Sequence, residues 1–215
     1  LIRATQEEVM AVKNLPGFNN DWDAAYVLIA LLLKGGKKEE FKKEIQTFPP
    51  INNKTKEYKK IQETFQTFYL GNCLYKELEK RDSPFSYPRG LILEEKCLIS
   101  KITLEKLNSF KLKLSIATGR PREEALFAIK NFNLQTFFPE IYIVALEDTA
   151  KEKPAPDPLF EAKKRMRTKN PIYIGDSIND VIAAKKANMP CIFVGYEKLG
   201  DYQIDNINKL EEILL

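Results

Sequence analysis

The stretch PIYIGDSINDVIAAKKAN, residues 171–188, places an apolar run directly before a glycine and two acidic residues. Continuous apolar residues with β-branched and aromatic members, as at 172–174, suit a strand in a sheet that is covered on both faces. Gly175 lets the chain turn, so Asp176 is expected at the carboxyl end of this strand and Asp180 in the helix that follows. Because ligands bind at this edge of open α/β sheets, the two carboxylates are candidates for a functional site.

Three further apolar segments, at 111–117, 141–145 and 191–195, are each separated from the next by enough residues for a helix. Repeated alternation of strand and helix predicts a parallel sheet with helices on both faces. The expected fold class is therefore α/β, and residues 83–215 are expected to form a Rossmann-like core domain.

The first part of the chain has a helical pattern. Thr5 and Glu8 form a capping box, and further helices are expected from about Asp23 to Gly35 and at 38–47, 55–69 and 72–80. The stretch RDSPFSYPRG, residues 81–90, is rich in proline, serine and glycine and indicates a linker. We therefore expect an all-helical domain at 1–82 and a change of period after it.

Composition and charge exclude several classes of protein. The 34 basic and 30 acidic residues are thoroughly mixed and sum to a net charge of +4, which favours no nucleic-acid partner. The longest apolar run, residues 24–33, is about half of the roughly 20 residues that cross a bilayer, so no membrane span is expected. The three cysteines are far apart and odd in number, which fits a reducing cytoplasm better than a disulfide framework.

The absence of histidine limits the chemistry that this chain can perform. It removes Ser-His-Asp and Cys-His nucleophile systems, histidine general bases and most zinc sites. Any enzyme built on this chain must use carboxylates, lysine, arginine and hydroxyl groups.

The segment SIATGRPREEAL, residues 115–126, repeats the strand-to-helix arrangement with Thr118 directly after the strand and Gly119 at the turn. A hydroxyl and backbone amides meet there, which is a natural place for a phosphate oxygen. The alternative is that Thr118 only caps the next helix. Lys153 precedes two prolines in KEKPAPDP and, taken alone, is interpreted as a surface lysine.

Taken together and in this order, these elements resemble the haloacid dehalogenase superfamily of phosphohydrolases. Thr118 matches the family's second motif, Lys153 its third, and Gly175, Asp176 and Asp180 its acidic fourth motif, GDxxxD. The resemblance runs from about residue 90 to the end of the chain. It is closest to the subgroup that carries a helical cap after its first strand, which the first 82 residues resemble.

The resemblance implies a magnesium-dependent phosphatase that hydrolyses a small phosphate monoester, as phosphoglycolate phosphatases do, through an aspartyl-phosphate. Asp176 would bind Mg²⁺, because this ion favours oxygen ligands, and Asp180 would orient Lys153 or a metal-bound water. Lys153 would also neutralise charge on the nucleophile and the phosphate. The residues expected to bind phosphate are Thr118, Gly119, Arg120 and Lys153.

The family's first motif, DxDG(T/V) after an apolar strand, has no match in the sequence. The only DxD, Asp21 to Asp23, follows a polar loop, and we interpret Asp23 as a helix cap. In the family, the strand that carries this motif lies between those ending at Thr118 and Gly175. We therefore expect that the strand and its nucleophile were lost, lie upstream of Leu1, or reside on another polypeptide.

Two other interpretations stay open. The chain could be a non-catalytic protein that binds a phosphorylated ligand through Thr118 and Lys153, or another enzyme of the same fold, either a phosphomutase or a dehalogenase. The expected partner in each phosphate-based case is a small phosphorylated metabolite, with the oligomeric state left open. Candidates for substrate contacts in the cap are Asn20 and Trp22, together with Arg3, Asn19 and Asp21, although an interhelical loop held by Asn and Asp side chains explains them equally well.

Overall fold

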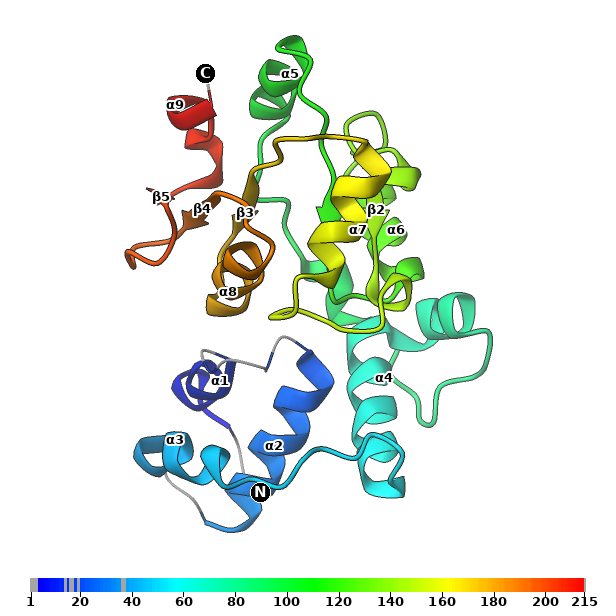
Figure 1. The fold of residues 1–215 in the computed structure, drawn as a ribbon. Helices are drawn as coiled ribbons and strands as arrows, with labels where there is room; N and C mark the ends of the chain where they lie inside the picture. The colour runs from blue at the N-terminus through cyan, green and yellow to red at the C-terminus, as the bar shows by residue number, and fades with distance from the viewer. Residues whose placement is uncertain (1–3, 14, 16–17, 19, 36–37, 215) are drawn as a thin grey trace. The chain divides into compact units, whose positions relative to one another are not determined.

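A computed structural model describes residues 4–13, 15, 18, 20–35 and 38–214 of the chain. These residues form two compact units, Leu1–Lys96 and Cys97–Leu215. Each unit is described by itself (Figure 1).

All regular elements among the described residues of the first unit are helices. The capping box is confirmed: the Glu8 amide donates to Thr5 Oγ1 at 3.2 Å, and the Thr5 amide donates to Glu8 Oε2 at 2.7 Å. Val12, Val27 and Phe41 lie in its buried core, where the first three helices pack together. Its elements are α1 (Gln6–Lys13), α2 (Asp21–Leu33), α3 (Lys38–Gln46), α4 (Lys56–Glu79) and a 3-10 turn, η1 (Leu91–Glu94).

The segment after α4 folds back onto that helix. Gly71, at φ 68°, interrupts the helical geometry inside α4, and a Cβ there would lie 2.4 Å from the nitrogen of Gly90. The Asn72 amide donates to the Tyr87 carbonyl at 2.8 Å, and Asn72 Oδ1 accepts from the Tyr87 amide at 2.7 Å. The proline-rich stretch is therefore packed against α4, and the first compact unit, which ends at Lys96, extends beyond the boundary expected after residue 82.

The second unit contains parallel strands and helices, which confirms the expected α/β class. Four strands lie within the segments that the sequence indicated, and the fifth, β5, was not expected. The strands are β1 (Ile116–Ala117), β2 (Ile143–Val144), β3 (Tyr173–Gly175), β4 (Cys191–Val194) and β5 (Tyr202–Ile204). The helices are α5 (Lys101–Ser109), α6 (Arg122–Asn131), α7 (Asp157–Met166), α8 (Ile178–Lys186) and α9 (Glu211–Leu214), with 3-10 turns η2 (Glu140–Tyr142), η3 (Leu146–Asp148) and η4 (Ile207–Lys209).

The strands form two parallel groups instead of one sheet. β1 pairs with β2, and β4 lies between β3 and β5. Within the described residues, β1 and β3 do not pair with each other, so each has one edge without a strand partner. Backbone groups along such edges need partners when they are buried.

Side chains of the strands pack against helices. Ile143 of β2 contributes to a buried cluster with Leu104 and Ile129, from α5 and α6. Ile192 of β4 contributes to a second cluster with Leu107 and Leu210. Because α5 contributes to both clusters, the two strand groups share one helix in their cores.

Replacement of Gly90 by alanine tests the close approach in the first unit. A Cβ at residue 90 would lie 2.1 Å from the carbonyl carbon of Leu70, so α4 or the returning segment must shift. We expect a loss of about 1–3 kcal/mol in the free energy of unfolding. Urea denaturation followed by the fluorescence of Trp22, the only tryptophan, measures it. Arg89→Ala, at the exposed neighbouring side chain, is the control, and equal stability of both variants would contradict the packing described here.

Candidate functional site

Thr118 lies immediately beyond β1, and its amide extends the pairing with β2 by donating to the Val144 carbonyl at 2.9 Å. Its hydroxyl oxygen accepts from the Arg120 amide at 3.1 Å, which shapes the turn over Gly119. The following helix has Pro121 at its N-cap and no side-chain cap. The interpretation of Thr118 as a helix cap is therefore wrong, and its hydroxyl belongs to the turn itself.

Lys153 is nearly buried, with 10% of its side chain exposed, so its interpretation as a surface lysine is wrong. Its Nζ donates to Asp180 Oδ1 at 2.7 Å, to the Tyr173 hydroxyl at 3.0 Å and to the Ala117 carbonyl at 3.2 Å. An ammonium group has three donors, and these three contacts use all of them. One side chain thus contacts the end of β1, strand β3 and helix α8.

Asp180 accepts hydrogen bonds at both carboxylate oxygens and is 6% exposed at its side chain. Oδ1 accepts from Lys153 and from the Tyr173 hydroxyl at 2.8 Å, and Oδ2 accepts from Ser177 Oγ at 2.6 Å and its amide at 3.1 Å. Burial alone would raise the pKa of Asp180, but the charge of Lys153 and these hydrogen bonds outweigh it and lower the pKa. Asp180 is therefore a fixed anion that holds Lys153 in place.

This arrangement requires a glycine at position 175. A Cβ at residue 175 would lie 2.3 Å from Cβ of Asp180 and 2.6 Å from its Cγ. Only glycine lets the end of β3 pass so close to the first turn of α8. The glycine of the GDxxxD pattern is thus needed to bring the second acid, Asp180, close to the end of β3.

Tyr173 is a member of the site that the sequence analysis missed. Burial, and then the charge of Asp180, raise the pKa of its phenol well above the ordinary value, so the hydroxyl stays protonated and donates to Asp180. In the sequence it stands inside an apolar run, where an aromatic residue is expected to pack. The signal that could have found it is the requirement of a buried tyrosine hydroxyl for a polar partner.

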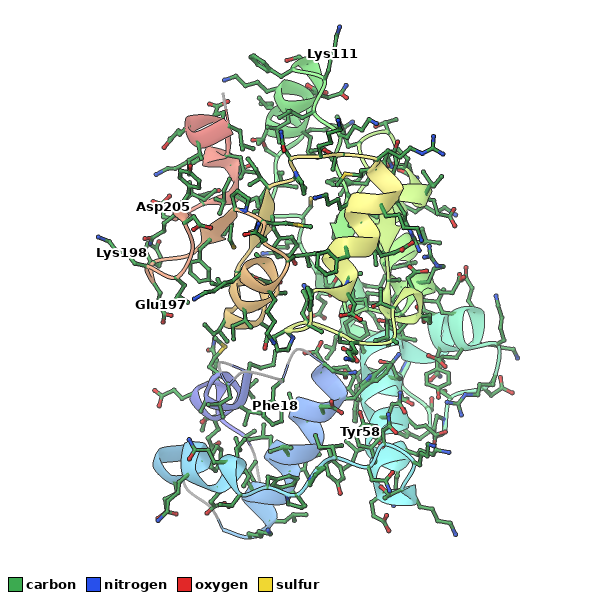
Figure 2. The ribbon with its side chains drawn as sticks, viewed as in Figure 1. Phe18, Tyr58, Lys111, Glu197, Lys198 and Asp205 are labelled. Carbon is green, nitrogen blue, oxygen red and sulfur yellow. The ribbon has the colours of Figure 1, made fainter. Side chains whose placement is uncertain are left out.

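Asp176 is exposed at the carboxyl end of β3, as expected. It borders a cavity of about 490 Å³ whose other polar side chains are Asp205, labelled in Figure 2, and Asn206. The rest of the lining is Leu98, Ile99, Ile174, Gly175, Val194 and Ile207. The acid is therefore accessible to a ligand, whereas Asp180 is enclosed.

The fit of this site to Mg²⁺ is partial. The ion binds oxygen ligands and usually keeps several waters beside one or two carboxylates and substrate phosphates. Asp176 offers one such carboxylate, while both oxygens of Asp180 accept hydrogen bonds from Lys153, Tyr173 and Ser177. Over the described ranges, no three acidic or cysteine side chains gather as a ready-made metal site.

The candidates in the first unit are engaged within that unit. Asn20 caps α2 by accepting from the Trp22 amide at 2.9 Å, and Trp22 Nε1 donates to Gln66 Oε1 at 3.1 Å. The expectation that Asp23 caps a helix is wrong: Asn20 is the cap, and Asp23 accepts from the hydroxyl of Tyr58, labelled in Figure 2, at 2.5 Å. Asp21 pairs with Lys13. The candidates Arg3 and Asn19 lie outside the described residues.

Residues 98–194 match the family of haloacid dehalogenase-like hydrolases. This part of the chain is similar to members of that family. Thr118, Lys153, Asp176 and Asp180 all fall inside the matched residues. No helix in the described ranges is long and apolar enough to cross a membrane.

Relatives similar in sequence carry the names of phosphatases. The chain is 36% identical over 101 residues to pyrophosphatase PpaX of Halalkalibacterium halodurans, a match that covers 46% of each chain. It is 30% identical over 97 residues to a phosphoglycolate phosphatase of Rhodobacter capsulatus, covering 44% of this chain and 43% of the relative. The chain thus spans about half the length of the curated relatives it matches.

Solved structures show the same fold. A predicted phosphoglycolate phosphatase from Haemophilus somnus aligns with a TM-score of 0.59 at 19% identity, covering 99% of this chain and 84% of the other. A haloacid dehalogenase-superfamily hydrolase, subfamily IA, from Geobacter sulfurreducens aligns with a TM-score of 0.52 at 15% identity, covering 98% and 90%. The expected α/β core with an additional helical domain is confirmed.

Tyr173→Phe tests the tyrosine of the site. The change removes one hydroxyl that donates to Asp180 and accepts from Lys153, and leaves the ring in place. We expect the free energy of unfolding to fall by about 1–2 kcal/mol, because the charged groups lose a buried partner. Chemical denaturation followed by circular dichroism measures it. Tyr196→Phe, at a side chain that is 87% exposed, is the control, and an equal effect of both changes would contradict the proposed contacts.

Proposed function

We propose that the protein is a magnesium-dependent phosphatase that acts on a small phosphorylated metabolite. The observation that carries this proposal is the buried Lys153, held by Asp180 and Tyr173 at the carboxyl ends of β1 and β3. A fixed ammonium group beside the Thr118 turn suits a phosphate, whose charge it neutralises. The similarity of residues 98–194 to a family of hydrolases supports the same conclusion.

Each residue of the site has a role in this proposal. The Thr118 hydroxyl, the Gly119 amide and Arg120 hold phosphate oxygens, and Lys153 balances their charge. Asp180 keeps Lys153 in position. Asp176 would hold Mg²⁺, which when bound neutralises charge on the transferred phosphoryl group.

The nucleophile in this proposal is a carboxylate carried on a strand between β1 and β3. Its oxygen attacks phosphorus, and the ester oxygen leaves with a proton from a second acid two residues beyond the nucleophile. That group then takes a proton from water, which attacks phosphorus and releases phosphate and the free carboxylate from the aspartyl-phosphate. Among the described residues, β1 and β3 each have one edge without a strand partner, which supports a place for such a strand. We propose that another segment, on this polypeptide or on a second one, supplies this strand.

The substrate class rests on the relatives, which are named for pyrophosphate and for phosphoglycolate. We propose a small phosphate monoester or pyrophosphate, and we propose the helical unit as a cap, with Asn20 and Trp22 as its candidates for substrate contact. A cytoplasmic location fits the free thiols of Cys73, Cys97 and Cys191.

A second candidate is a non-catalytic protein that binds a phosphorylated ligand. The observation that favours it is that no carboxylate other than Asp180 is bonded to Lys153 among the described residues. In that case Thr118 and Lys153 would bind the phosphate and no turnover would follow.

A panel of phosphate monoesters and pyrophosphate, with and without Mg²⁺, tests the two candidates. We expect phosphate release that requires Mg²⁺ and falls on the order of 10²-fold in Lys153→Ala and in Asp176→Asn, because each change removes a charge at the site. Phosphate release measured colorimetrically reports the rates. Lys198→Ala, at an exposed lysine, is the control and should retain full activity.

The outcomes separate the candidates. Binding of inorganic phosphate that Lys153→Ala abolishes, without turnover of any ester, would favour the binding protein. Turnover that is insensitive to Lys153→Ala would contradict both candidates.

A further inference from the structure

A second group of charged side chains lies beyond the end of β2. Asp148, in η3, pairs with Arg122 at the start of α6 and with Arg165 of α7, whose Nη2 lies 3.0 Å from Asp148 Oδ1. Glu161, one turn before Arg165, accepts from its Nε at 2.9 Å. The side chain of Asp148 is 15% exposed, and those of the two arginines are 28% and 20% exposed. This group, the Asp148 cluster, joins two helices to one loop.

Asp148 is charged over the ordinary range of pH. Burial raises its pKa, but hydrogen bonds from the Ala145 amide, Arg122 and Arg165 outweigh that effect and lower the pKa to about 2. The bond from Ala145 measures 2.7 Å. The carboxylate therefore holds its own loop as well as the two arginines.

The loop that Asp148 holds runs beside the Thr118 turn. The Leu146 amide donates to the Arg120 carbonyl at 2.9 Å, and the Arg122 amide donates to Glu147 Oε2 at 3.0 Å. Before them, the Thr118 amide donates to the Val144 carbonyl at 2.9 Å. The residues 118–122 are thus hydrogen-bonded along their length to residues 144–147.

Both arginines also bind the backbone of β2. Arg165 Nη1 donates to the Ile143 carbonyl at 2.7 Å, and Arg122 Nη2 donates to the same oxygen at 3.4 Å. Asp148 therefore fixes the guanidinium groups of both arginines against the backbone of β2. Loss of its charge would leave both cations partly buried without their shared partner, which is costly.

From these contacts we infer that Asp148 is a positioning residue for the Thr118–Arg120 turn. It acts through Leu146 and Arg122 and makes no contact of its own with the turn's hydroxyl. It keeps the backbone amides and the hydroxyl of the turn in one fixed arrangement. The benefit for phosphate binding rests on the function proposed above, whereas the fixing of the turn does not.

The test compares the variant Asp148→Asn with the variant Glu161→Gln. Asparagine keeps the size and an oxygen for the Ala145 amide but removes the charge between the arginines. Glu161→Gln removes the other acid of the cluster, which contacts Arg165 and Lys164 but not the loop. Both variants are measured by hydrogen–deuterium exchange, by thermal unfolding, and by the KM of the best ester and the inhibition constant of inorganic phosphate.

We expect the amides of residues 118–120, 122 and 144–146 to exchange about tenfold faster or more in Asp148→Asn, since charged hydrogen bonds are worth about that much. The KM and the inhibition constant should rise by a similar factor, with a smaller change in kcat. Glu161→Gln should leave these amides and constants unchanged. Equal exchange of these amides in the two variants would overturn the inference.

Two further results keep the test decisive. If Asp148→Asn does not fold, Arg165→Lys weakens the same cluster with its charge preserved, and unchanged exchange at 118–122 in that variant would overturn the inference. If the wild-type protein turns over no ester but Asp148→Asn still loosens the turn selectively, the inference stands and the proposed function fails.

Discussion

The buried ammonium group of Lys153 is the constraint on which the rest of the second unit depends. An ammonium group removed from water is costly unless it is paired and hydrogen-bonded, and Lys153 meets this condition only where β1, β3 and α8 all reach it. Its contacts fix the end of β1 relative to β3 although these strands do not pair among the described residues. Gly175 and the cap formed by Ser177 depend on the same constraint, because both are needed to bring Asp180 to the lysine.

The strand edges differ in which groups satisfy their backbone hydrogen bonds. On the outer side of β2, the Ile143 carbonyl accepts hydrogen bonds from Arg122 and Arg165. Side chains from helices α6 and α7 therefore satisfy part of this edge. On the inner side of β1, Lys153 satisfies one carbonyl, that of Ala117. A side chain can satisfy single backbone groups in this way, but a whole strand edge is satisfied by another strand. The inner edges of β1 and β3 therefore suit an extended segment better than a helix or a loop.

Local pattern predicted four of the five described strands and the places of Thr118 and Asp176 directly after them, because apolar runs, turn glycines and their order are properties of neighbouring residues. It failed for features that depend on residues far apart in the sequence. Tyr173 was interpreted only as part of an apolar strand, and its role depends on Lys153 and Asp180, which other segments supply. The return of residues 83–96 onto α4 depends on Gly71 meeting Gly90. The short strand β5, with an exposed Tyr202, has too few residues for its period to be recognised.

Two charged groups flank the Thr118 turn: Lys153 with Asp180 on one side, and the Asp148 cluster on the other. Both carboxylates have a lowered pKa in the folded state, so their stabilisation is complete above the unfolded pKa of about 4 and is lost as the pH falls below it. Tyr173 titrates well above its ordinary pKa, and the chain contains no histidine, whose ordinary pKa would fall between about pH 5 and 8. The charges of Asp148 and Asp180 and the neutral phenol of Tyr173 therefore stay constant across this range, so a pH dependence of the site within it comes from other groups or from the ligand.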